Sequence, residues 1–381
     1  MENKYFGDIK KNFGFGFMRL PMIGEEVDLE QTKQMVDTFM EAGFNYFDTA
    51  HGYISGKSEI ALRESLVKRY PRDSYILTDK LSPSYFNCKE DIYTYFDTML
   101  EACGVEYFDF FLMHAQCTEL FEKYKRCEAY ETAFELKEQG KVKHVGFSFH
   151  DKAEVLDQIL TEYPEIEVVQ IQFNYLDYED PVVESRKCYE VCVKHNKPVI
   201  VMEPVRGGRL VNLPNEAQKI IDELQTEEQA GHRSNASYAI RFAASFPQVM
   251  MVLSGMSDMD QMNDNISYMK DFKPLSEKEH EALRQVCDIL VEQNLIPCTA
   301  CKYCVDGCPK QIPIPDLFRD YNDKACRCAT DIDSDANYKL HTDGKGKASD
   351  CIGCGKCEKE CPQHLEIRKL LKRTAWAFEN Y

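Results

Sequence analysis

The sequence predicts an α/β protein in which a large (β/α)8 barrel precedes a small, cysteine-rich C-terminal domain. Amphipathic helix patterns alternate with short apolar runs, and successive runs end at intervals of about 33 residues, the length that a βα unit requires. The runs are too apolar for a sheet with one face in water, which favours a parallel sheet covered by helices. Ten of the 17 cysteines lie beyond residue 290. We therefore expect the barrel over residues 1–285 and the second domain over residues 286–381.

The predicted strands each follow a helix pattern that stops at a glycine or a polar turn. The helix over residues 32–42 stops at Gly43, the helix over 91–103 at Gly104 and the helix over 130–139 at Gly140. Eight apolar runs favour a closed barrel over an open sheet, and in such barrels the polar residues at the carboxyl ends of the strands face the active site. The runs are residues 15–19, 44–48, 74–80, 108–113, 144–148, 168–174, 198–203 and 249–254.

Two segments depart from this repeat. Residues 204–234 are long for a loop after a strand, and their charged part, 217–229, is expected to form a helix of its own. We interpret this segment as a lid or cofactor flap. Residues 275–294 are expected to form a helix that leads into the second domain.

The composition limits the partners of the chain. It has 46 Lys and Arg against 64 Asp and Glu, a net charge of −18, which argues against nucleic acid and anionic membranes. No stretch approaches the roughly 18 unbroken apolar residues of a membrane span, and the start lacks the apolar core of a signal peptide. We expect a cytoplasmic protein whose free cysteines suit a reducing interior.

The C-terminal cysteines form two copies of the motif Cys-x2-Cys-x2-Cys-x3-Cys-Pro, which holds cubane 4Fe-4S clusters. In this motif three cysteines converge on one cube, and the fourth reaches the other. Zinc sites and a disulfide framework fit the spacing and the chain length poorly. Cys326 and Cys328 miss the spacing and are expected to be spare thiols. The sequence thus predicts two clusters, one held by Cys298, Cys301, Cys304 and Cys361, the other by Cys351, Cys354, Cys357 and Cys308.

Four polar residues stand at or shortly after the predicted strand ends. Asp48 and Tyr53 follow the second strand, Lys80 ends the third and His114 ends the fourth. With the segments 47–53, 110–114, 146–148 and 170–174, these residues make the chain resemble the aldo-keto reductases over roughly residues 10–275. The cysteine-rich part resembles a bacterial dicluster ferredoxin, a small α+β iron-sulfur domain, fused behind the barrel.

The resemblance implies an oxidoreductase that transfers hydride from NAD(P)H to a small-molecule carbonyl. Tyr53 would donate the proton to the developing oxyanion, which requires its pKa of about 10 to be lowered. Lys80 would favour the phenolate by its charge, Asp48 would hold Lys80 by an ion pair, and His114 would orient the carbonyl oxygen.

The resemblance also implies the cofactor contacts. Ser148 and Gln170 would hold the nicotinamide carboxamide, and Asn265 would contact the adenine end. The segment Arg206-Gly207-Gly208 is another candidate site for binding a phosphate group, since its glycines expose backbone amides and its arginine can pair with the anion.

Several positions depart from the family pattern. Phe149 stands where an asparagine is expected, Glu203 where an aromatic residue stacks on nicotinamide, and Phe17 where a threonine is usual. Near the last strand, Ser254 and Gln261 replace the basic residues that grip a 2′-phosphate. The sequence therefore leaves the choice between NADH and NADPH open. Arg19, near the barrel mouth, is a candidate for an anionic group of the substrate.

A hydride carries two electrons, whereas each cubane exchanges one, so three functions stay open. The first is an NAD(P)H-dependent carbonyl reductase whose clusters are structural, sense redox state or exchange electrons with a partner protein. The second is a barrel that binds FMN or another flavin and exchanges electrons with the clusters. The third is a non-catalytic electron-transfer protein. The four polar residues at the strand ends favour the first.

Overall fold

The computed structural model describes residues 6–228, 233–293, 295–326 and 333–379. Contacts within the chain divide it into two compact units, Met1–Pro204 with Ser237–Leu275, and Val205–Ala236 with Ser276–Tyr381. Helix α11 runs unbroken from Glu277 to Glu292 and belongs whole to the second unit, and the expected domain boundary after residue 285 stays a prediction. The segment after the seventh barrel strand also joins the second unit.

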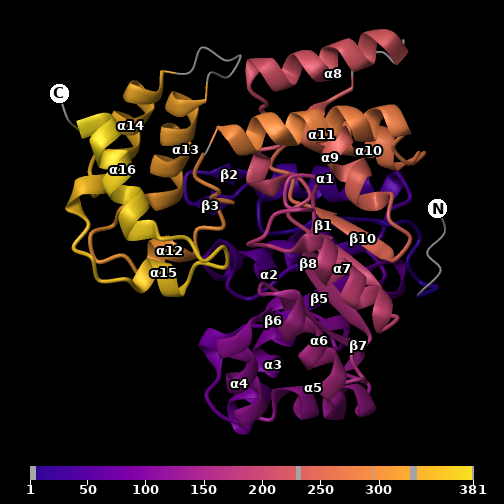
Figure 1. Ribbon diagram of the computed structural model, residues 1–381. Coiled ribbons are helices and arrows are strands. Elements are labelled where there is room, and N and C mark those ends of the chain that lie inside the picture. Colours follow the sequence, from indigo (N-terminus) through magenta and orange to yellow (C-terminus); the bar gives the residue numbers. More distant parts are fainter. Residues whose placement is uncertain (1–5, 229–232, 294, 327–332, 380–381) are drawn as a thin grey trace. The chain divides into compact units, whose positions relative to one another are not determined.

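The first unit is a closed barrel of eight parallel strands in the order β1-β10-β9-β8-β7-β6-β5-β4 (Figure 1). Strands that follow one another along the chain are neighbours in the barrel, so each βα unit adds one strand to the barrel wall. The predicted (β/α)8 barrel is confirmed. Its strands are β1 (Phe13–Gly16), β4 (Tyr46–Asp48), β5 (Ile76–Leu81), β6 (Phe108–Gln116), β7 (Val142–Phe149), β8 (Val168–Gln172), β9 (Val199–Met202) and β10 (Val249–Ser254).

Helices between the strands cover the outside of the barrel. In α1 (Leu29–Glu41), Asp28 caps the first turn by accepting from the Gln31 backbone N–H at 3.0 Å, and Met35 and Phe39 turn a buried face to the strands. The other helices are α2 (Lys57–Leu62), α3 (Lys89–Cys103), α4 (Thr118–Arg126), α5 (Ala129–Glu138), α6 (Ala153–Glu162), α7 (Ser185–Lys194), α9 (Asn235–Ala244) and α10 (Met259–Met269). A short hairpin of β2 (Met22–Ile23) and β3 (Glu26–Val27) precedes α1.

Large apolar side chains fill the barrel interior. Tyr46, Phe110 and Leu112 are among the buried residues of this core. Gly146 in β7 lets the neighbouring strand approach, because a Cβ atom built there would lie 2.4 Å from the Val168 carbonyl oxygen. The interior is therefore packed, and the strand ends are the place for a site that binds a ligand.

The second unit begins with the segment that follows β9. Helix α8 (Asn215–Glu228) packs against α11, and the two lie side by side in Figure 1. Ser276 and Glu279 form a capping box at the start of α11, and Arg233 donates to Glu279 at 3.0 Å. Both predicted helices are confirmed; residues 229 and 294, which they were expected to include, lie outside the described residues.

The rest of the second unit is a small domain built on a core of its own. The buried residues of this core include Ile314, Leu317, Phe318, Ile367 and Leu371, together with three of the motif cysteines. The described residues of 276–379 form helices and turns without a strand, so the expected β component of this domain stays a prediction. Its helices are α12 (Tyr303–Asp306), α13 (Ile314–Ala325), α14 (Ser334–Thr342), α15 (Lys356–Lys359) and α16 (Ile367–Glu379).

Among the residues described, no helix is both long enough and apolar enough to cross a membrane.

Candidate active site and metal centres

Five of the predicted site residues lie at the carboxyl ends of neighbouring strands. They are Asp48 on β4, Lys80 on β5, His114 on β6, Ser148 on β7 and Gln170 on β8. Because the strands are parallel and adjacent, their carboxyl ends meet at one mouth of the barrel. The alternation of helix and strand patterns thus places these side chains around a common space.

A buried ion pair forms the floor of this site. The Lys80 ammonium donates to Asp48 Oδ1 at 2.6 Å and to the Thr49 carbonyl at 2.8 Å, and Lys80 is fully buried. Burial raises the pKa of the Asp48 carboxyl, while the charge and hydrogen bond of Lys80 act to lower it. Removing either partner would leave the other charge buried and unpaired, so the pair is held as a unit.

Tyr53 lies over this pair. It begins the turn Tyr53–Gly56, in which Ile54 and Ser55 adopt left-handed backbone angles with φ of 51° and 54°. The Lys80 ammonium lies 4.9 Å from the centre of the Tyr53 ring, and the Tyr53 and His114 ring centres are 6.0 Å apart. The structure therefore brings all four predicted catalytic residues together. A cation so close to the phenol favours its ionised form.

His114 is neutral in this surrounding. The surrounding protein desolvates the half-buried His114 and so lowers its pKa well below the ordinary value, and Lys80 and His150 act in the same direction. Ser82 Oγ lies 2.7 Å from His114 Nδ1. When Ser82 donates to Nδ1, the ring proton resides on Nε2, the tautomer that can donate to a carbonyl oxygen.

Ser82 was not among the site residues predicted from the sequence. The signal was a polar side chain two residues beyond Lys80, past the end of the apolar run, but serines are common in such turns. Only the packing of β5 beside β6 shows that this one reaches the imidazole.

We expect Ser82→Ala to lower kcat/KM for carbonyl reduction about tenfold, the effect of losing one hydrogen bond that orients the imidazole. Steady-state kinetics with NAD(P)H measure it. Ser74→Ala, before the opposite end of the same strand, is the matched control and should be close to wild type. Equal rates for both variants would contradict the orienting role of Ser82.

Ser148 and Gln170 adjoin the four residues. Ser148 Oγ accepts from the Ala115 backbone N–H at 2.8 Å, directly after His114, and Gln170 Nε2 lies 3.5 Å from Asp48 Oδ2. Asn265 on α10 donates to Ser254 Oγ at 2.8 Å, at the end of β10. These contacts hold the side chains in place, and their roles in cofactor binding stay predictions.

Two departures from the family pattern have structural roles. Phe17 is fully buried, and its ring lies 5.9 Å from that of Phe47, so it belongs to the core. Glu203 has a φ of 57°, and its carbonyl accepts from Asn174 Nδ2 at 3.0 Å.

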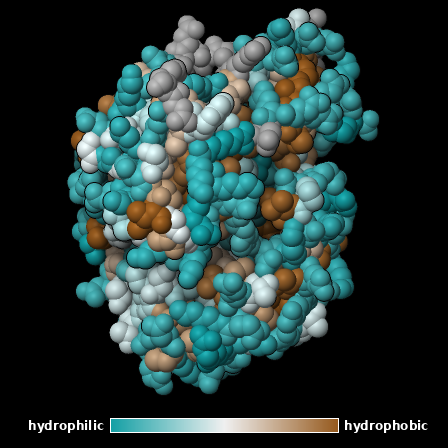
Figure 2. Space-filling model, turned by 60° about the vertical axis from the view of Figure 1, so that its left-hand side comes forward, coloured by the Kyte–Doolittle hydropathy of each residue, from teal (hydrophilic) through white to brown (hydrophobic). Residues whose placement is uncertain are grey.

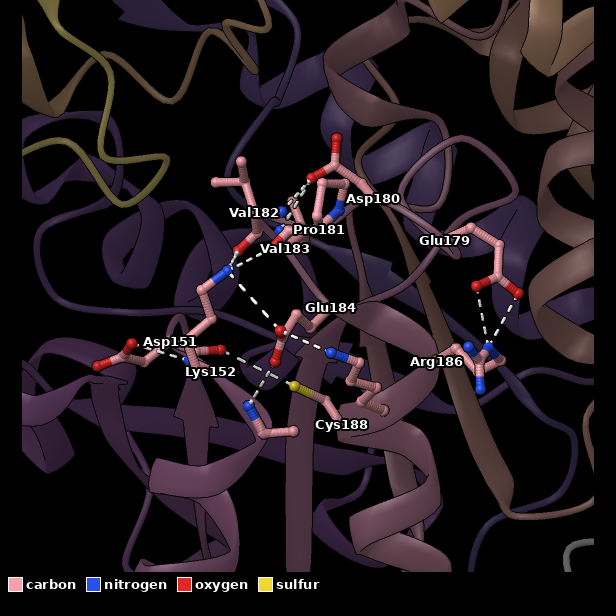
Figure 3. Close-up of polar contacts among 12 residues, drawn as sticks. Asp151, Lys152, Glu179, Asp180, Pro181, Val182, Val183, Glu184, Arg186 and Cys188 are labelled. Carbon is pink, nitrogen blue, oxygen red and sulfur yellow. Dashed lines mark hydrogen bonds and ion pairs between the residues drawn. The ribbon is translucent and has the colours of Figure 1, made fainter.

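Hydrogen bonds connect the loop after β7 to the loop after β8 (Figure 3). Lys152, after β7, donates to the carbonyls of Pro181 and, at 2.8 Å, Val182 in the loop after β8. Asp180 accepts from the backbone N–H groups of Val182 and Val183 at 2.7 and 3.0 Å. These bonds fix the rim of the barrel beyond Ser148 and Gln170.

The segment Arg206–Gly208 lies against the first cysteine run, in the second unit. A Cβ atom on Gly207, whose φ is 63°, would lie 2.4 Å from the carbonyl oxygen of Thr299, the residue after Cys298. Arg206 is buried, while the Cβ position of Gly208 is open. This loop therefore contacts the residue that follows a predicted cluster ligand. The role of the loop in binding a phosphate group stays a prediction.

The eight motif cysteines line two small cavities, four in each. The first is lined by Cys298, Cys301, Cys304 and Cys361, the second by Cys308, Cys351, Cys354 and Cys357. Each cavity takes three cysteines from one run and the fourth from the other, which is the crossed arrangement predicted from the motif. Four converging sulfur ligands are the donor set of a cubane.

The electrostatics of the first cavity agree with this donor set. Burial raises the pKa of the Cys304 thiol, and the neighbouring thiolates of Cys301, Cys298 and Cys361 raise it further. Four thiolates so close repel one another unless positive iron ions lie between them. The residues present therefore fit a 4Fe-4S cluster. Cys326 takes part in a disulfide, so the expectation of a spare thiol is wrong for this residue. Cys328 lies outside the described residues.

A buried acidic cluster behind the site was also missed. Glu59, Asp79 and Cys103 bring one oxygen or sulfur atom each within 4.8 Å of one another, and all three are buried. Burial raises the pKa of Glu59 to about 7 and that of Asp79 well above its ordinary value. His51 Nδ1 lies 2.7 Å from Glu59 Oε2. A functional or structural cluster at Asp79 was not predicted, because this residue lies inside an apolar strand.

This cluster predicts a pH-dependent stability. Because the pKa of Glu59 is about 7 in the folded chain against 4.5 for an ordinary glutamate, folding favours the protonated form. The resulting stability is fully present below pH 4.5 and is lost as the pH rises through 7, a change on the order of 3 kcal/mol.

As the pH rises from 5.5 to 8, the Tm of Glu59→Gln should therefore fall less than the Tm of wild type. Far-UV circular dichroism measures both. The exposed Glu154→Gln on α6 is the control and should follow wild type. A wild-type slope in the Glu59 variant would show that this carboxyl does not titrate as described.

Comparison with known proteins agrees with both halves of the chain. The model of the aldo/keto reductase family matches residues 12–288, and that of the 4Fe-4S dicluster domain matches residues 297–366. An NADH-specific methylglyoxal reductase of Escherichia coli (strain K12) is 23% identical over 296 residues, which cover 67% of this chain and 88% of that protein.

Solved structures share the barrel fold. An aldo-keto reductase from Klebsiella pneumoniae in complex with NADPH has a TM-score of 0.58 at 19% identity, covering 72% of this chain and 90% of that one. The aldo-keto reductase AKR11C1 from Bacillus halodurans, in its holo form, has a TM-score of 0.57 at 22% identity, covering 73% and 92%. With the family model matched over most of its length, the chain belongs to the aldo/keto reductase family and is an oxidoreductase with a 4Fe-4S dicluster domain behind its barrel.

Proposed function

We propose that this oxidoreductase transfers a hydride from NAD(P)H to a small-molecule carbonyl, with Tyr53 as the proton donor, and that its second domain holds two 4Fe-4S clusters. The observation that carries the proposal is the assembly of Tyr53 and His114 over the buried Lys80–Asp48 pair. These residue types in this geometry serve the protonation of an oxyanion at a carbonyl.

The roles follow from the contacts. Asp48 holds the Lys80 ammonium beside the Tyr53 ring, and that charge stabilises the phenolate left when Tyr53 gives its proton to the carbonyl oxygen. His114, neutral and oriented through Nδ1 by Ser82, donates from Nε2 to the same oxygen. A bound nicotinamide supplies the hydride.

Ser148 and Gln170 are the residues proposed to hold the carboxamide of the nicotinamide, and Asn265 the adenine end. Ser148 and Gln170 adjoin His114 and Asp48, which supports this placement. One relative is named as NADH-specific and one matching structure contains NADPH. Both nucleotides are therefore proposed as donors to be compared directly.

The clusters are proposed to exchange single electrons with a partner protein. The Cys298, Cys301, Cys304 and Cys361 set and the Cys308, Cys351, Cys354 and Cys357 set would each hold one cube, which supplies one-electron chemistry when bound. The relatives and structures named above lend no support to the flavin alternative, so a nicotinamide-dependent reductase is the function retained.

Anaerobic assays at 340 nm test the proposal. NADH and NADPH are each offered with a panel of small aldehydes, ketones and dicarbonyls, methylglyoxal among them. Carbonyl-dependent oxidation of at least one nucleotide is expected, with no yellow chromophore released on acid precipitation. A released flavin, together with no nucleotide oxidation by the cluster-loaded protein, would overturn the proposal.

A further inference from the structure

Helix α16 turns a basic and aromatic face to the outside of the second unit. Its buried side consists of Ile367, Leu371, Thr374 and Phe378. On the other side Arg368, Lys369, Lys372 and Trp376 recur at spacings of three and four residues and are all exposed. Trp376, the chain's one tryptophan, is 75% exposed.

This face adjoins the second set of cluster cysteines. Cys351 and Gly353 line an open hollow of about 820 Å³ together with Arg368, Lys372 and Trp376. The side chains of Glu358, Glu366 and Glu379 line it as well. Next to it, Cys354 is exposed, as is 61% of Ile352. A cluster held by these cysteines would therefore lie near the surface, beside the tryptophan and the basic residues.

The charge of this region opposes that of the whole chain. Residues 345–379 carry eight Lys or Arg against five Asp or Glu, a surplus of three positive charges in a chain whose net charge is −18. From Ile367 to Glu379 helix α16 has four basic residues and one acidic residue, Glu379, which accepts from the Tyr338 hydroxyl at 2.5 Å. Glu358 and Glu366 pair with Arg368 and Lys369, whereas no ion pair of Lys372 is found among the described residues.

We propose that this face docks an acidic protein that carries single electrons, and that the second cluster is where those electrons enter. One electron passes from the reduced carrier to the cluster held by Cys308, Cys351, Cys354 and Cys357. The carrier is oxidised and the cluster reduced, with no bond made or broken. This inference rests on the proposed function, in which the clusters exchange electrons with a partner protein.

The physical chemistry favours such a partner. Electron-transfer complexes are small and weak, and opposite charge steers their encounter. An aromatic side chain among basic ones suits the centre of a small interface. Figure 2 shows one face of the molecule, on which hydrophobic side chains lie singly or in small groups in a hydrophilic surface. A permanent, broadly apolar interface is not favoured there.

An anionic membrane is the competing ligand for a basic amphipathic helix. The apolar side of α16 is already packed in the core of its own unit, so it cannot enter a lipid surface. A protein surface is therefore the better match.

Binding to the cluster-loaded full chain tests the inference, without nicotinamide or carbonyl present. The probe is a plant-type [2Fe-2S] ferredoxin, an acidic one-electron carrier, followed by calorimetry and by the emission of Trp376. Basic cytochrome c and anionic phosphatidylserine vesicles are the comparison ligands. We expect ferredoxin to bind at low salt, shift the Trp376 emission and lose affinity as salt is raised.

Lys369→Glu with Lys372→Glu should weaken ferredoxin binding about tenfold or more. Lys219→Glu with Lys278→Glu, the same charge change on α8 and α11, should stay within about twofold of wild type. Absorbance near 400 nm checks that each variant keeps its clusters.

Equal affinities of the two double variants, binding to vesicles alone, or tighter binding of cytochrome c would overturn the inference. Because no nucleotide is present, a failure here leaves the hydride chemistry untouched, and a failure of that chemistry leaves the docking result untouched.

Discussion

Replacing Tyr53 by phenylalanine is expected to lower kcat/KM for carbonyl reduction by about 10²–10⁴, the range of general acid catalysis. The reason is geometric. Tyr53 lies beside the buried Lys80 ammonium and the His114 ring, so its hydroxyl is the group placed to give a proton to the carbonyl oxygen. Phenylalanine keeps the ring and loses the proton.

Two further measurements make this result specific. The iron content and the absorbance near 400 nm of Tyr53→Phe should equal those of wild type, since the cluster cysteines belong to the other unit. Tyr163→Phe, after α6 and before β8, removes a hydroxyl near the opposite end of the barrel and should keep the wild-type rate. Full turnover by Tyr53→Phe would show that the proton comes from elsewhere.

Replacing Cys361 by alanine is expected to remove the first cluster, although this cysteine belongs to the second run. Cys361 lines the cavity of Cys298, Cys301 and Cys304, so its loss leaves that cube with three ligands. The iron content should fall by up to about half, since two equivalent cubes are expected.

Electron paramagnetic resonance of the reduced protein identifies the missing cluster. The spectrum of Cys361→Ala should match that of Cys304→Ala, and the spectrum of Cys308→Ala should match that of Cys357→Ala. If Cys361→Ala instead resembled Cys357→Ala, each run would hold its own cube and the crossed arrangement would be wrong.

The sequence predicted those features that follow from period and spacing. Asp48, Lys80 and His114 were found because a polar residue that ends an apolar run must lie at the mouth of a parallel barrel. The crossed cysteine sets followed from the motif, and the cavities have the same composition. Helices α8 and α11 were visible as charged, periodic segments.

What the sequence did not reveal depends on contacts between distant segments. Gly207 lies against Thr299, which is more than 90 residues later in the chain, and neither segment contains a pattern that predicts this contact. Neither Ser82 nor Asp79 stands out in the sequence. In the folded chain Ser82 lies beside the His114 ring, and Asp79 lies near Glu59. The packing of α8 against α11 within the second unit is likewise a contact between segments far apart in the sequence.

The fate of the hydride tests the central claim most directly. NADH and NADPH that carry two deuterium atoms at C4 of the nicotinamide are mixed anaerobically with the cluster-loaded protein and an active carbonyl, and the alcohol is examined by mass spectrometry. We predict one deuterium on the carbinol carbon in every turnover and about 10²–10⁴ less product with Tyr53→Phe. An alcohol formed without deuterium from either nucleotide, with its electrons drawn through the clusters, would contradict a hydride site in this barrel.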